Sequence, residues 1–159
     1  MTPRSLFRTA STAEAITWTL LIIGMVLKYI TKTTDLGVRV FGLIHGVVFL
    51  AYVLVSLALW VNQRWSTKTA LLALAAAVPP WATLWFDRHA EKHGLVDGPW
   101  RLGPGTFPAG REGGSLSLPE RGLDTALRYP VLSVVGGAAI VAVATAILLW
   151  IGPPVPWAR

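Results

Sequence analysis

The sequence has 159 residues, of which 53% are apolar and 14% charged, whereas an ordinary soluble domain carries about 25% charged residues. So few charges cannot coat a water-soluble globule, and the apolar residues arrive in four long blocks instead of alternating with polar ones. The chain is therefore predicted to be an all-α integral membrane protein whose solvent is the lipid bilayer. It contains no cysteine, which excludes disulfides and cysteine-ligated metals.

The net charge of +6 comes from 14 Lys and Arg residues against 8 Asp and Glu residues. Such a balance would fit a nucleic-acid partner if the cations formed one patch. They lie instead in short clusters at the ends of the apolar blocks, where lipid headgroups are found. The sequence therefore predicts a membrane partner and no nucleic acid.

The first apolar block runs from about residue 13 to 30, after an N-terminal tail over residues 1–12. Basic residues precede it as in a signal peptide, but the block is about eighteen residues long, lacks a small-x-small cleavage site and is followed by further spans. We interpret it as a retained transmembrane helix. Ser11 and Glu14 have the S-x-x-E spacing of a capping box, which predicts a helix start there.

The second and third blocks cover residues 36–61 and 67–86. At 1.5 Å per residue the second block exceeds the hydrocarbon thickness of roughly 30 Å, so its helix should tilt or project. Pro79 and Pro80 lie in the third block, and each removes a backbone donor and clashes with the carbonyl four residues earlier. A kinked third helix is expected, and residues 13–86 should form a three-helix membrane domain.

Residues 87–129 change in character. Eight Gly, four Pro and twelve charged residues fall within the 42 residues from 87 to 128, which predicts a polar loop outside the membrane. Ser117 and Glu120 repeat the capping-box spacing, so a short helix lying at the membrane interface is expected there. A fourth transmembrane helix is predicted over residues 130–151, and residues 152–159 form a tail. Nine basic residues against five favour the long loop on the cytoplasmic side.

Four ionisable residues fall inside the predicted spans, where a charge costs about 2.5–3.5 kcal/mol. They are the candidate functional residues Glu14, Lys28, Arg39 and His45. Glu14 is either the capping carboxylate of the first helix or an inward-facing functional group. Lys28 and Arg39 lie near helix ends, where each is expected to reach the headgroups; the alternative for Lys28 is that it lines a polar path.

His45 is the most informative candidate, because it lies about ten residues into the second helix and hence near mid-membrane. Gly42 and Gly46 flank it on one helical face, where they would let another backbone approach. The imidazole is expected to form an interhelical hydrogen bond, for instance to a carbonyl freed by Pro79 or Pro80. A proton relay, or a metal, haem or other ligand contact, is the alternative.

Other patterns favour packing over chemistry. Ser133 and Gly137 begin a row of small residues in the fourth block, which is typical of helix–helix contacts. His89 and His93 have the i, i+4 spacing of a zinc pair but are crowded by cations, which favours a solvated helix extension. No catalytic constellation, metal site or cofactor site is predicted, and the chain is not expected to be an enzyme.

Several short motifs together resemble a known family. They are Ala13-Glu14-Ala15, Leu27-Lys28-Tyr29, the run from Gly42 to Phe49, Arg64-Trp65, and the run from Pro79 to Thr83. Over about residues 12–88 the chain resembles the YdzA-like small bacterial membrane proteins of unknown function. The resemblance implies a three-helix membrane domain of bacterial origin and no known activity, cofactor or ligand, while the long loop and the fourth helix lie outside it.

The leading functional expectation is a non-enzymatic accessory or structural subunit of the bacterial cytoplasmic membrane. It would act by helix packing, in a homo-oligomer or with other membrane proteins. The first alternative is a transporter- or channel-like protein in which Glu14, Lys28 and His45 line a polar path. The second is a haem-binding membrane protein with His45 as ligand.

Overall fold

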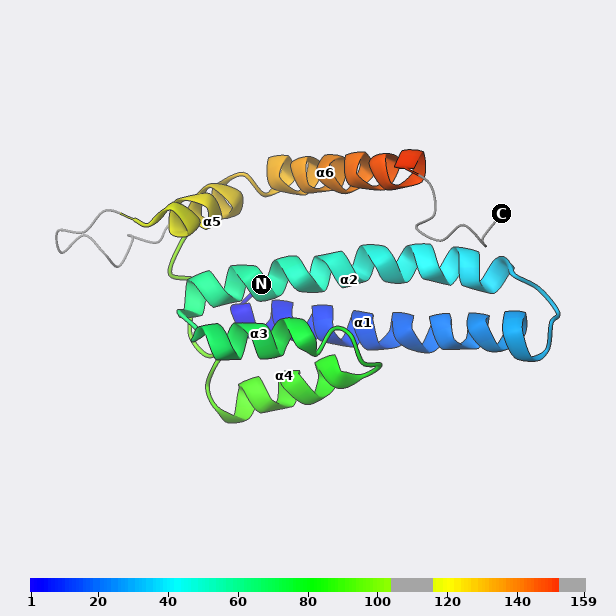
Figure 1. Cartoon of the computed structure of the whole chain (residues 1–159). Helices are drawn as coiled ribbons and strands as arrows, with labels where there is room; N and C mark the ends of the chain where they lie inside the picture. Colours follow the sequence, from blue (N-terminus) through cyan, green and yellow to red (C-terminus); the bar gives the residue numbers. More distant parts are fainter. Residues whose placement is uncertain (104–115, 152–159) are drawn as a thin grey trace. The chain divides into compact units, whose positions relative to one another are not determined.

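The computed structural model describes residues 1–103 and 116–151 of the chain (Figure 1). Every regular element in this part of the chain is helical. The elements are α1 (Pro3–Met25), the π-helical turn η1 (Val26–Ile30), α2 (Leu36–Gln63), α3 (Thr67–Ala75), α4 (Ala82–Lys92), α5 (Leu118–Arg128) and α6 (Pro130–Ile151). The chain divides into two compact units, Met1–Arg101 with α1 to α4 and Leu102–Arg159 with α5 and α6.

The first helix begins ten residues earlier than expected. Thr2 is its N-cap and accepts a hydrogen bond from the backbone N–H of Ser5, and Pro3 occupies the first turn, where its missing N–H costs nothing. The predicted capping box at Ser11 and Glu14 is therefore wrong. Both side chains lie inside α1 and are fully buried. Of the two alternatives for Glu14, a helix cap or an inward-facing carboxylate, the structure shows the second.

The second helix, α2, agrees with the predicted span to within two residues at its C-terminal end. It runs antiparallel to α1, because the two helices are joined by the short turn after Ile30 and touch at Gly24 and Gly37. A Cβ atom built on Gly24 would lie 2.7 Å from the carbonyl carbon of Gly37. Only glycine at both positions allows this approach of the two backbones.

The single kinked helix expected over residues 67–86 is instead two helices. Ser66 caps α3 as predicted, by accepting a hydrogen bond from the Thr69 N–H, but α3 ends at Ala75. Pro79 and Pro80 cannot donate to the carbonyls of Ala75 and Ala76, and the residue before each proline is disfavoured in helical geometry. Trp81 then takes a left-handed conformation, with φ +62°, before α4 begins. Two successive prolines thus break the helix rather than bend it.

After the break the chain reverses, so that α3 and α4 form an antiparallel hairpin (Figure 1). Near the start of α1, Arg8 contacts Asp87, and farther along α1, Thr19 contacts Trp81. The order of these contacts shows that α4 runs antiparallel to α1. The tip of the hairpin therefore lies beside the middle of α1, and both of its ends return to the N-terminal end of α1.

Aromatic side chains form the core at that end of the first unit. Phe7 lies at its centre, with ring centroids 5.7 Å from Tyr52, 6.0 Å from Trp65 and 5.8 Å from Phe86. Phe7, Tyr52 and Phe86 are completely buried. One residue from α1 thus joins α2, α4 and the turn before α3 into a single core.

The chain beyond α4 completes the first unit. The Trp65 indole N–H donates to the carbonyl of Leu95 at 2.6 Å, and that of Trp100 donates to the carbonyl of Met1 at 2.9 Å. Arg101 donates from its side chain to the carbonyls of Val61 and Asn62. These carbonyls end α2 and lack partners within the helix, so Arg101 caps α2 from a distant part of the sequence.

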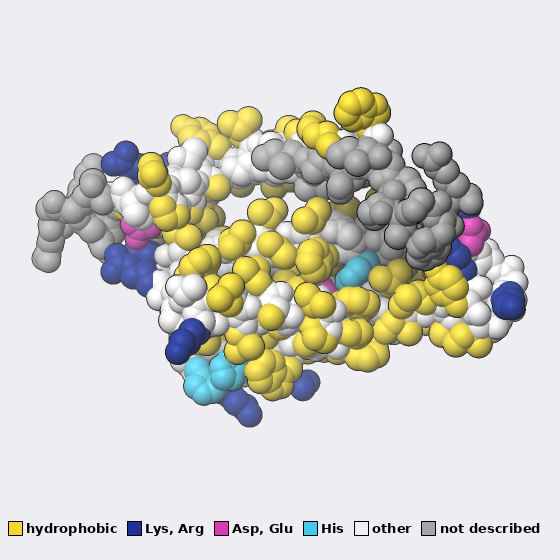
Figure 2. All heavy atoms as spheres, viewed as in Figure 1, with side chains coloured by type: hydrophobic (Ala, Val, Ile, Leu, Met, Phe, Trp, Pro, Cys, Tyr) yellow, Lys and Arg dark blue, Asp and Glu magenta, His cyan; other side chains and the backbone are white. Residues whose placement is uncertain are grey.

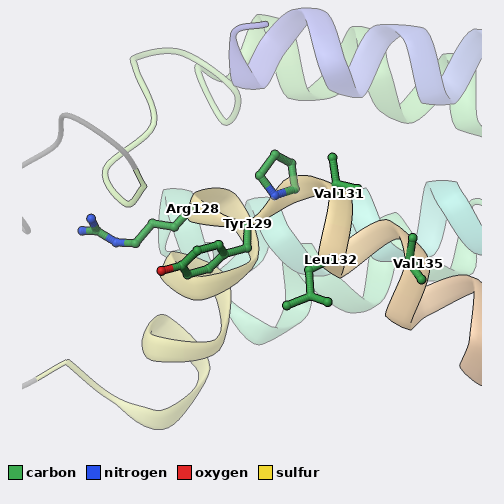
Figure 3. Close-up of a pocket in the computed structure, with 6 residues that line it drawn as sticks. Arg128, Tyr129, Val131, Leu132 and Val135 are labelled. Carbon is green, nitrogen blue, oxygen red and sulfur yellow. The ribbon is translucent and has the colours of Figure 1, made fainter.

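The second unit contains the predicted short helix, α5. Its capping box is confirmed, since Glu120 accepts a hydrogen bond from the Ser117 N–H at 3.1 Å. Helix α6 has the predicted bounds of residues 130–151, and an open, mainly apolar pocket lies where α5 meets α6 (Figure 3). The parts of the predicted loop and tail at residues 104–115 and 152–159 lie outside the described residues.

Two helices in the described part of the chain are long and apolar enough to cross a membrane. The first is α1 together with η1, and the second is α2. In the most apolar stretch of α2, only 17% of the residues are buried inside the protein. Figure 2 shows hydrophobic side chains over much of the visible face. An apolar surface of this extent needs lipid or another protein to cover it.

Candidate functional site

A buried polar cluster occupies the interface of α1, α2 and α4. Its centre is Glu14, which is 0% exposed and whose Oε2 accepts a hydrogen bond from the Thr83 hydroxyl at 2.9 Å. The same hydroxyl lies 3.2 Å from the main-chain carbonyl of Ser11. The other carboxylate oxygen, Oε1, has no hydrogen-bond partner. A buried polar atom without a partner is uncommon and costly, so this carboxylate marks a candidate site.

His45 approaches the same cluster from α2. Its Nδ1 lies 3.0 Å from the Thr17 hydroxyl, and that hydroxyl also lies 2.9 Å from the main-chain carbonyl of Glu14. The predicted interhelical hydrogen bond of His45 therefore exists, but its partner is a threonine of α1 and not a carbonyl freed by proline. The Trp18 ring packs against the imidazole at 4.5 Å between centroids. Glu14 and His45 are thus brought to the two sides of one turn of α1.

Two tryptophan indoles, and not His45, make the polar contacts near the proline break. The Trp18 indole N–H donates to the carbonyl of Ala77 at 3.4 Å, and the Trp81 indole N–H donates to the Thr19 hydroxyl at 3.0 Å. Two tryptophans therefore join the tip of the hairpin to the middle of α1, directly beyond Glu14 and Thr17. These contacts close the polar cluster on that side.

The structure keeps Lys28 and Arg39 apart from this cluster. Lys28 lies in η1, with its Nζ 5.2 Å from the centroid of the Tyr29 ring. Arg39 is exposed and pairs with Asp35 at 2.6 Å, one turn earlier on the same helix. Both lie near the turn that joins α1 to α2. Of the four candidate residues, the structure places only Glu14 and His45 together.

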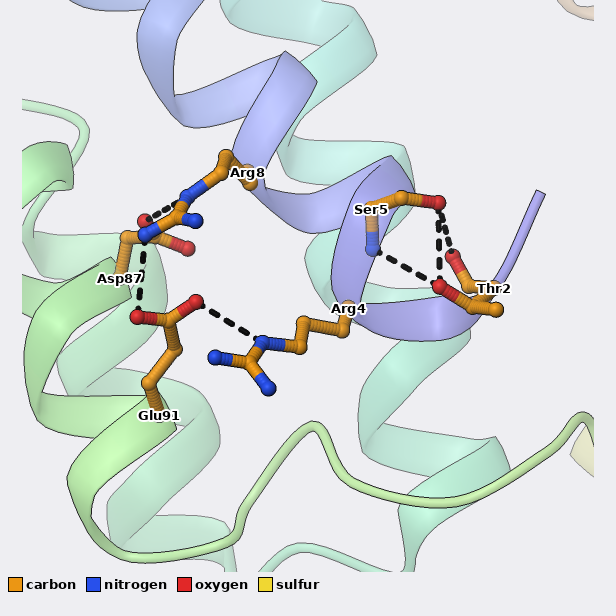
Figure 4. Close-up of polar contacts among 6 residues, drawn as sticks. All are labelled: Thr2, Arg4, Ser5, Arg8, Asp87 and Glu91. Carbon is orange, nitrogen blue, oxygen red and sulfur yellow. Dashed lines mark hydrogen bonds and ion pairs between the residues drawn. The ribbon is translucent and has the colours of Figure 1, made fainter.

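An ionic group lies at the other end of the cluster, where α1 begins (Figure 4). Arg4 and Arg8 contact the two oxygens of Glu91 at 2.9 and 3.0 Å, and Arg8 also lies 3.5 Å from Asp87. Burial raises the pKa of Asp87, and the Arg8 guanidinium opposes this rise. The Oδ1 atom of Asp87 is buried without a hydrogen-bond partner. The cations are therefore committed to Asp87 and Glu91.

The polar cluster includes residues that the sequence reasoning missed: Ser11, Thr17, Tyr52, Thr83 and Asp87. Phe7, Ser11, Glu14 and Thr17 recur every three or four residues and so lie on one face of α1. Thr83, Asp87 and Glu91 do the same on α4. The available signal was this helical spacing of polar residues, which continues across the start of the first apolar block and the end of the third.

The residues predicted to pack helices together show few contacts within the chain. A Cβ on Gly42 would meet only the side chain of Leu21, at 3.8 Å, and a Cβ on Gly46 or Gly137 would meet nothing within 4 Å. Ser133 donates to the carbonyl of Ala126 at 3.3 Å. A packing role for these residues toward another molecule stays a prediction.

His89 and His93 lie at the end of α4 with ring centroids 4.1 Å apart. His93 Nδ1 lies 2.8 Å from the carbonyl of His89, which satisfies the end of the helix. In the described residues no group of three or more His, Cys, Asp or Glu side chains could hold a metal ion.

These features define a helical membrane protein with a buried polar cluster between α1, α2 and α4. The family described as "Domain of unknown function (DUF3817)" matches residues 4–92, more than half of the chain, and the chain belongs to this family. The match covers the whole of the polar cluster and the helices that form it. It agrees with the resemblance to an uncharacterised membrane family over residues 12–88, while the YdzA-like name stays a prediction.

The protein is also similar to a Streptomyces coelicolor protein named "Putative membrane protein SCO5905". The two are 44% identical over 87 residues, which are 54% of this chain and 10% of that protein. No solved structure matches the chain.

Proposed function

We propose that this protein is a non-enzymatic accessory module of the bacterial cytoplasmic membrane that packs against another membrane protein. One observation carries the proposal: a closely similar segment forms only 10% of the Streptomyces coelicolor protein, whose printed name places it in a membrane. There the segment is one part of a chain about ten times as long as itself. Two proteins that work together are often held by fusion in one organism and by contact in another, and the effective concentration gained by fusion favours such contacts.

The exposed face of α2 supplies the surface that this role requires. Seven apolar residues on it are exposed and alternate at spacings of four and three: Leu36, Val40, Leu43, Val47, Leu50, Leu54 and Leu57. This is the heptad spacing of helices that pack in a left-handed coiled coil, and we call these seven residues the apolar row of α2. Lipid contact requires only apolarity, whereas a regular row of this kind suits another helix. Gly46 lies beside the apolar row with no neighbour within 4 Å.

The proposal includes an arrangement in the membrane. Helices α1 and α2 each cross the bilayer, the α3–α4 hairpin enters it from one side and returns, and α6 crosses separately. Within residues 1–101, the end at which α1 begins carries Arg4, Arg8, Arg64, Lys68, Arg88, Lys92 and Arg101. The opposite end carries Lys28, Lys32 and Arg39. Seven cations against three favour the N-terminus on the cytoplasmic side.

Site-specific photocrosslinking in living cells tests the packing role. A photoreactive amino acid at Val47, in the apolar row of α2, should join the full-length protein to one defined membrane protein or to a second copy, identified by mass spectrometry. The matched control is the same amino acid at Ile16, which is 55% exposed on α1 outside the apolar row. Equal and scattered crosslinking at both positions would show that lipid covers the apolar row.

The transporter-like alternative is favoured by the contact between the Glu14 turn and His45, although Lys28 lies elsewhere. It predicts proton or ion flux in liposomes that His45→Ala abolishes. The haem-binding alternative predicts a Soret band in freshly purified protein that the same substitution removes. Flux or a Soret band that depends on His45 would replace the accessory role as the leading function.

A further inference from the structure

Two rows of polar side chains face each other along α1 and α4, and we call them the seam. On α4 the row is Glu91, Asp87 and Thr83, spaced by four residues, and on α1 it is Arg4, Arg8, Ser11 and Glu14. The antiparallel helices bring these rows together through the Arg4–Glu91, Arg8–Asp87, Thr83–Ser11 and Thr83–Glu14 contacts. The seam therefore leads from the exposed end of α1 (Figure 4) to a buried carboxylate.

The Thr83 hydroxyl beside Glu14 has more hydrogen-bond acceptors within reach than protons to donate. Thr83 carries one hydroxyl proton, yet both Glu14 Oε2 and the Ser11 carbonyl lie within reach of it. If Glu14 is a neutral acid, it donates to the Thr83 oxygen and Thr83 donates to the Ser11 carbonyl. If Glu14 is ionised, the Thr83 hydroxyl is the donor to Oε2, and the buried Oε1 keeps its charge density without a hydrogen-bond partner. A neutral acid therefore fits this buried position better than a carboxylate does.

The charged and titratable groups around Glu14 support the same state. On α1, Arg8 is held by Asp87 and Glu91 of α4, while α2 contributes His45, through Thr17, and Tyr52, whose hydroxyl donates to the carbonyl of Ala73 in α3. No ion pair joins Glu14 to any of the described cations. An isolated buried carboxylate is so costly that the group takes up a proton instead.

The seam also offers free acceptors between the exposed end and Glu14. Ser11 Oγ, Asp87 Oδ1 and Glu14 Oε1 are all buried without a partner. Ser11 and Glu14 are one turn apart on α1, and Thr83 and Asp87 are one turn apart on α4. Proton-accepting oxygens therefore recur at each turn of the seam.

We propose that Glu14 is a proton-binding site inside the membrane, reached from the N-terminal end of α1 through Glu91, Asp87 and Thr83. A hydronium ion at Glu91 or Asp87 releases a proton and becomes water; the proton moves along the seam, and the Glu14 carboxylate becomes a neutral acid. The O–H bond broken in hydronium is replaced by the O–H bond formed on Glu14, with no other net change. Trp18 of α1 and Trp81 at the tip of the hairpin close the far side, so the site exchanges its proton with one side of the membrane only. The inference does not depend on the accessory role.

Infrared spectroscopy of the full-length protein in liposomes tests the bound proton. The wild type should show the carbonyl stretch of a protonated carboxylic acid, and Glu14→Gln should remove it while keeping the size and hydrogen-bonding capacity of the side chain. The control, Asp35→Asn, removes a half-exposed carboxylate at the start of α2, far from the N-terminal end of α1, and should keep the band. Labelling glutamate with carbon-13 in the wild type should shift the band, which decides the question even if Glu14→Gln fails to fold. An unshifted or absent band overturns the proposal.

The route is tested by the rate at which that band shifts after transfer into heavy water. Thr83→Val should slow the exchange roughly tenfold, since it removes a hydrogen bond at the buried end of the seam, and Thr83→Ser should restore it. Thr125→Val, in α5 outside the first unit, is the control and should exchange like the wild type. Unchanged exchange in Thr83→Val overturns the seam as the route.

Discussion

Single residues determine how closely the helices of the first unit approach. At Gly24 and Gly37 the backbones of α1 and α2 touch, and there is no room for a Cβ on either residue. The sequence predicts such an approach at Gly42 and Gly46 instead, because they flank a histidine on one helical face. A pair of glycines four residues apart can be recognised within the sequence of one helix. The pairing of glycines between two helices depends on the geometry of the connecting turn, and residue spacing does not predict that geometry.

The Gly24→Ala substitution should therefore destabilise the protein. The added methyl group would lie 2.7 Å from the carbonyl carbon of Gly37, so the helices must separate, at a cost of about 1–3 kcal/mol. Thermal unfolding in mild detergent, followed by circular dichroism, measures the change. Gly46→Ala is the matched control and should leave the melting temperature unchanged or raise it, since its Cβ meets nothing and alanine favours the helix.

Thr17 should be necessary for the position of His45. Thr17→Val keeps the shape of the side chain but leaves the buried Nδ1 of His45 without its partner at 3.0 Å, which costs about 1–3 kcal/mol. Denaturant titration measures this loss, and Thr17→Ser should recover most of it. Thr9→Val on the exposed face of the same helix removes only a hydroxyl bond to the carbonyl of Ser5. If both valine variants were equally stable, the Thr17–His45 contact would contribute nothing.

The acid stability of the protein should depend on Asp87. Burial raises the pKa of this carboxyl above its ordinary value of 3.8, against the opposing effect of Arg8. The folded state therefore binds this proton more tightly than the unfolded chain does. The contribution of Asp87 protonation to the free energy of unfolding is present below pH 3.8 and is lost as the pH rises through the raised pKa. Unfolding free energies measured upward from that pH should fall in the wild type and stay flatter in Asp87→Asn. An identical pH profile for the two proteins would contradict this assignment, and Asp35→Asn serves as the control.

At the scale of whole elements, the apolar blocks predicted α2 and α6 closely because length and hydropathy alone define a long apolar helix. The same reasoning failed for the third block. Two adjacent prolines were expected to bend one helix, but Trp81 enters the left-handed region and the chain reverses. What decides between a kink and a reversal is the set of contacts that the second half finds. Here Thr83 contacts Glu14, 69 positions away, and Asp87 contacts Arg8, which is 79 positions away.

The reversal has a direct consequence for membrane topology. If residues 67–92 form a hairpin that enters and returns, Lys92 lies on the same side as Lys68, whereas a spanning third helix would place Lys92 with Lys32. Because the chain has no cysteine, single cysteines at these three exposed positions can be labelled with a membrane-impermeant maleimide in intact and inverted vesicles. We expect cysteines at 68 and 92 to react from one side and a cysteine at 32 from the other. Reaction at 92 and 32 from the same side would establish a third span.

At the scale of the whole molecule, the family match and the compact unit differ in extent. The match ends at residue 92, but the first unit continues to Arg101. Val96 is completely buried, the Leu95 carbonyl accepts from Trp65, and Arg101 caps the end of α2. The sequence of residues 93–101 predicts part of a polar loop, because Gly, Pro and charged residues are frequent there. Their anchoring contacts lie far away in sequence, and no local pattern predicts them.

A chain ending at Arg101 should therefore fold, whereas one ending at Lys92 should be measurably weaker. The shorter chain loses the buried Val96 side chain, worth about 1.5–3 kcal/mol, together with hydrogen bonds that contribute about 0.5–1.5 kcal/mol each. Comparing the thermal unfolding of both fragments with that of the full chain in the same detergent gives the difference. Equal stability of the two fragments would mean that residues 93–101 only lie against the helices. A marked loss would show that the membrane module is built from residues 1–101, with its last turn outside the family's boundary.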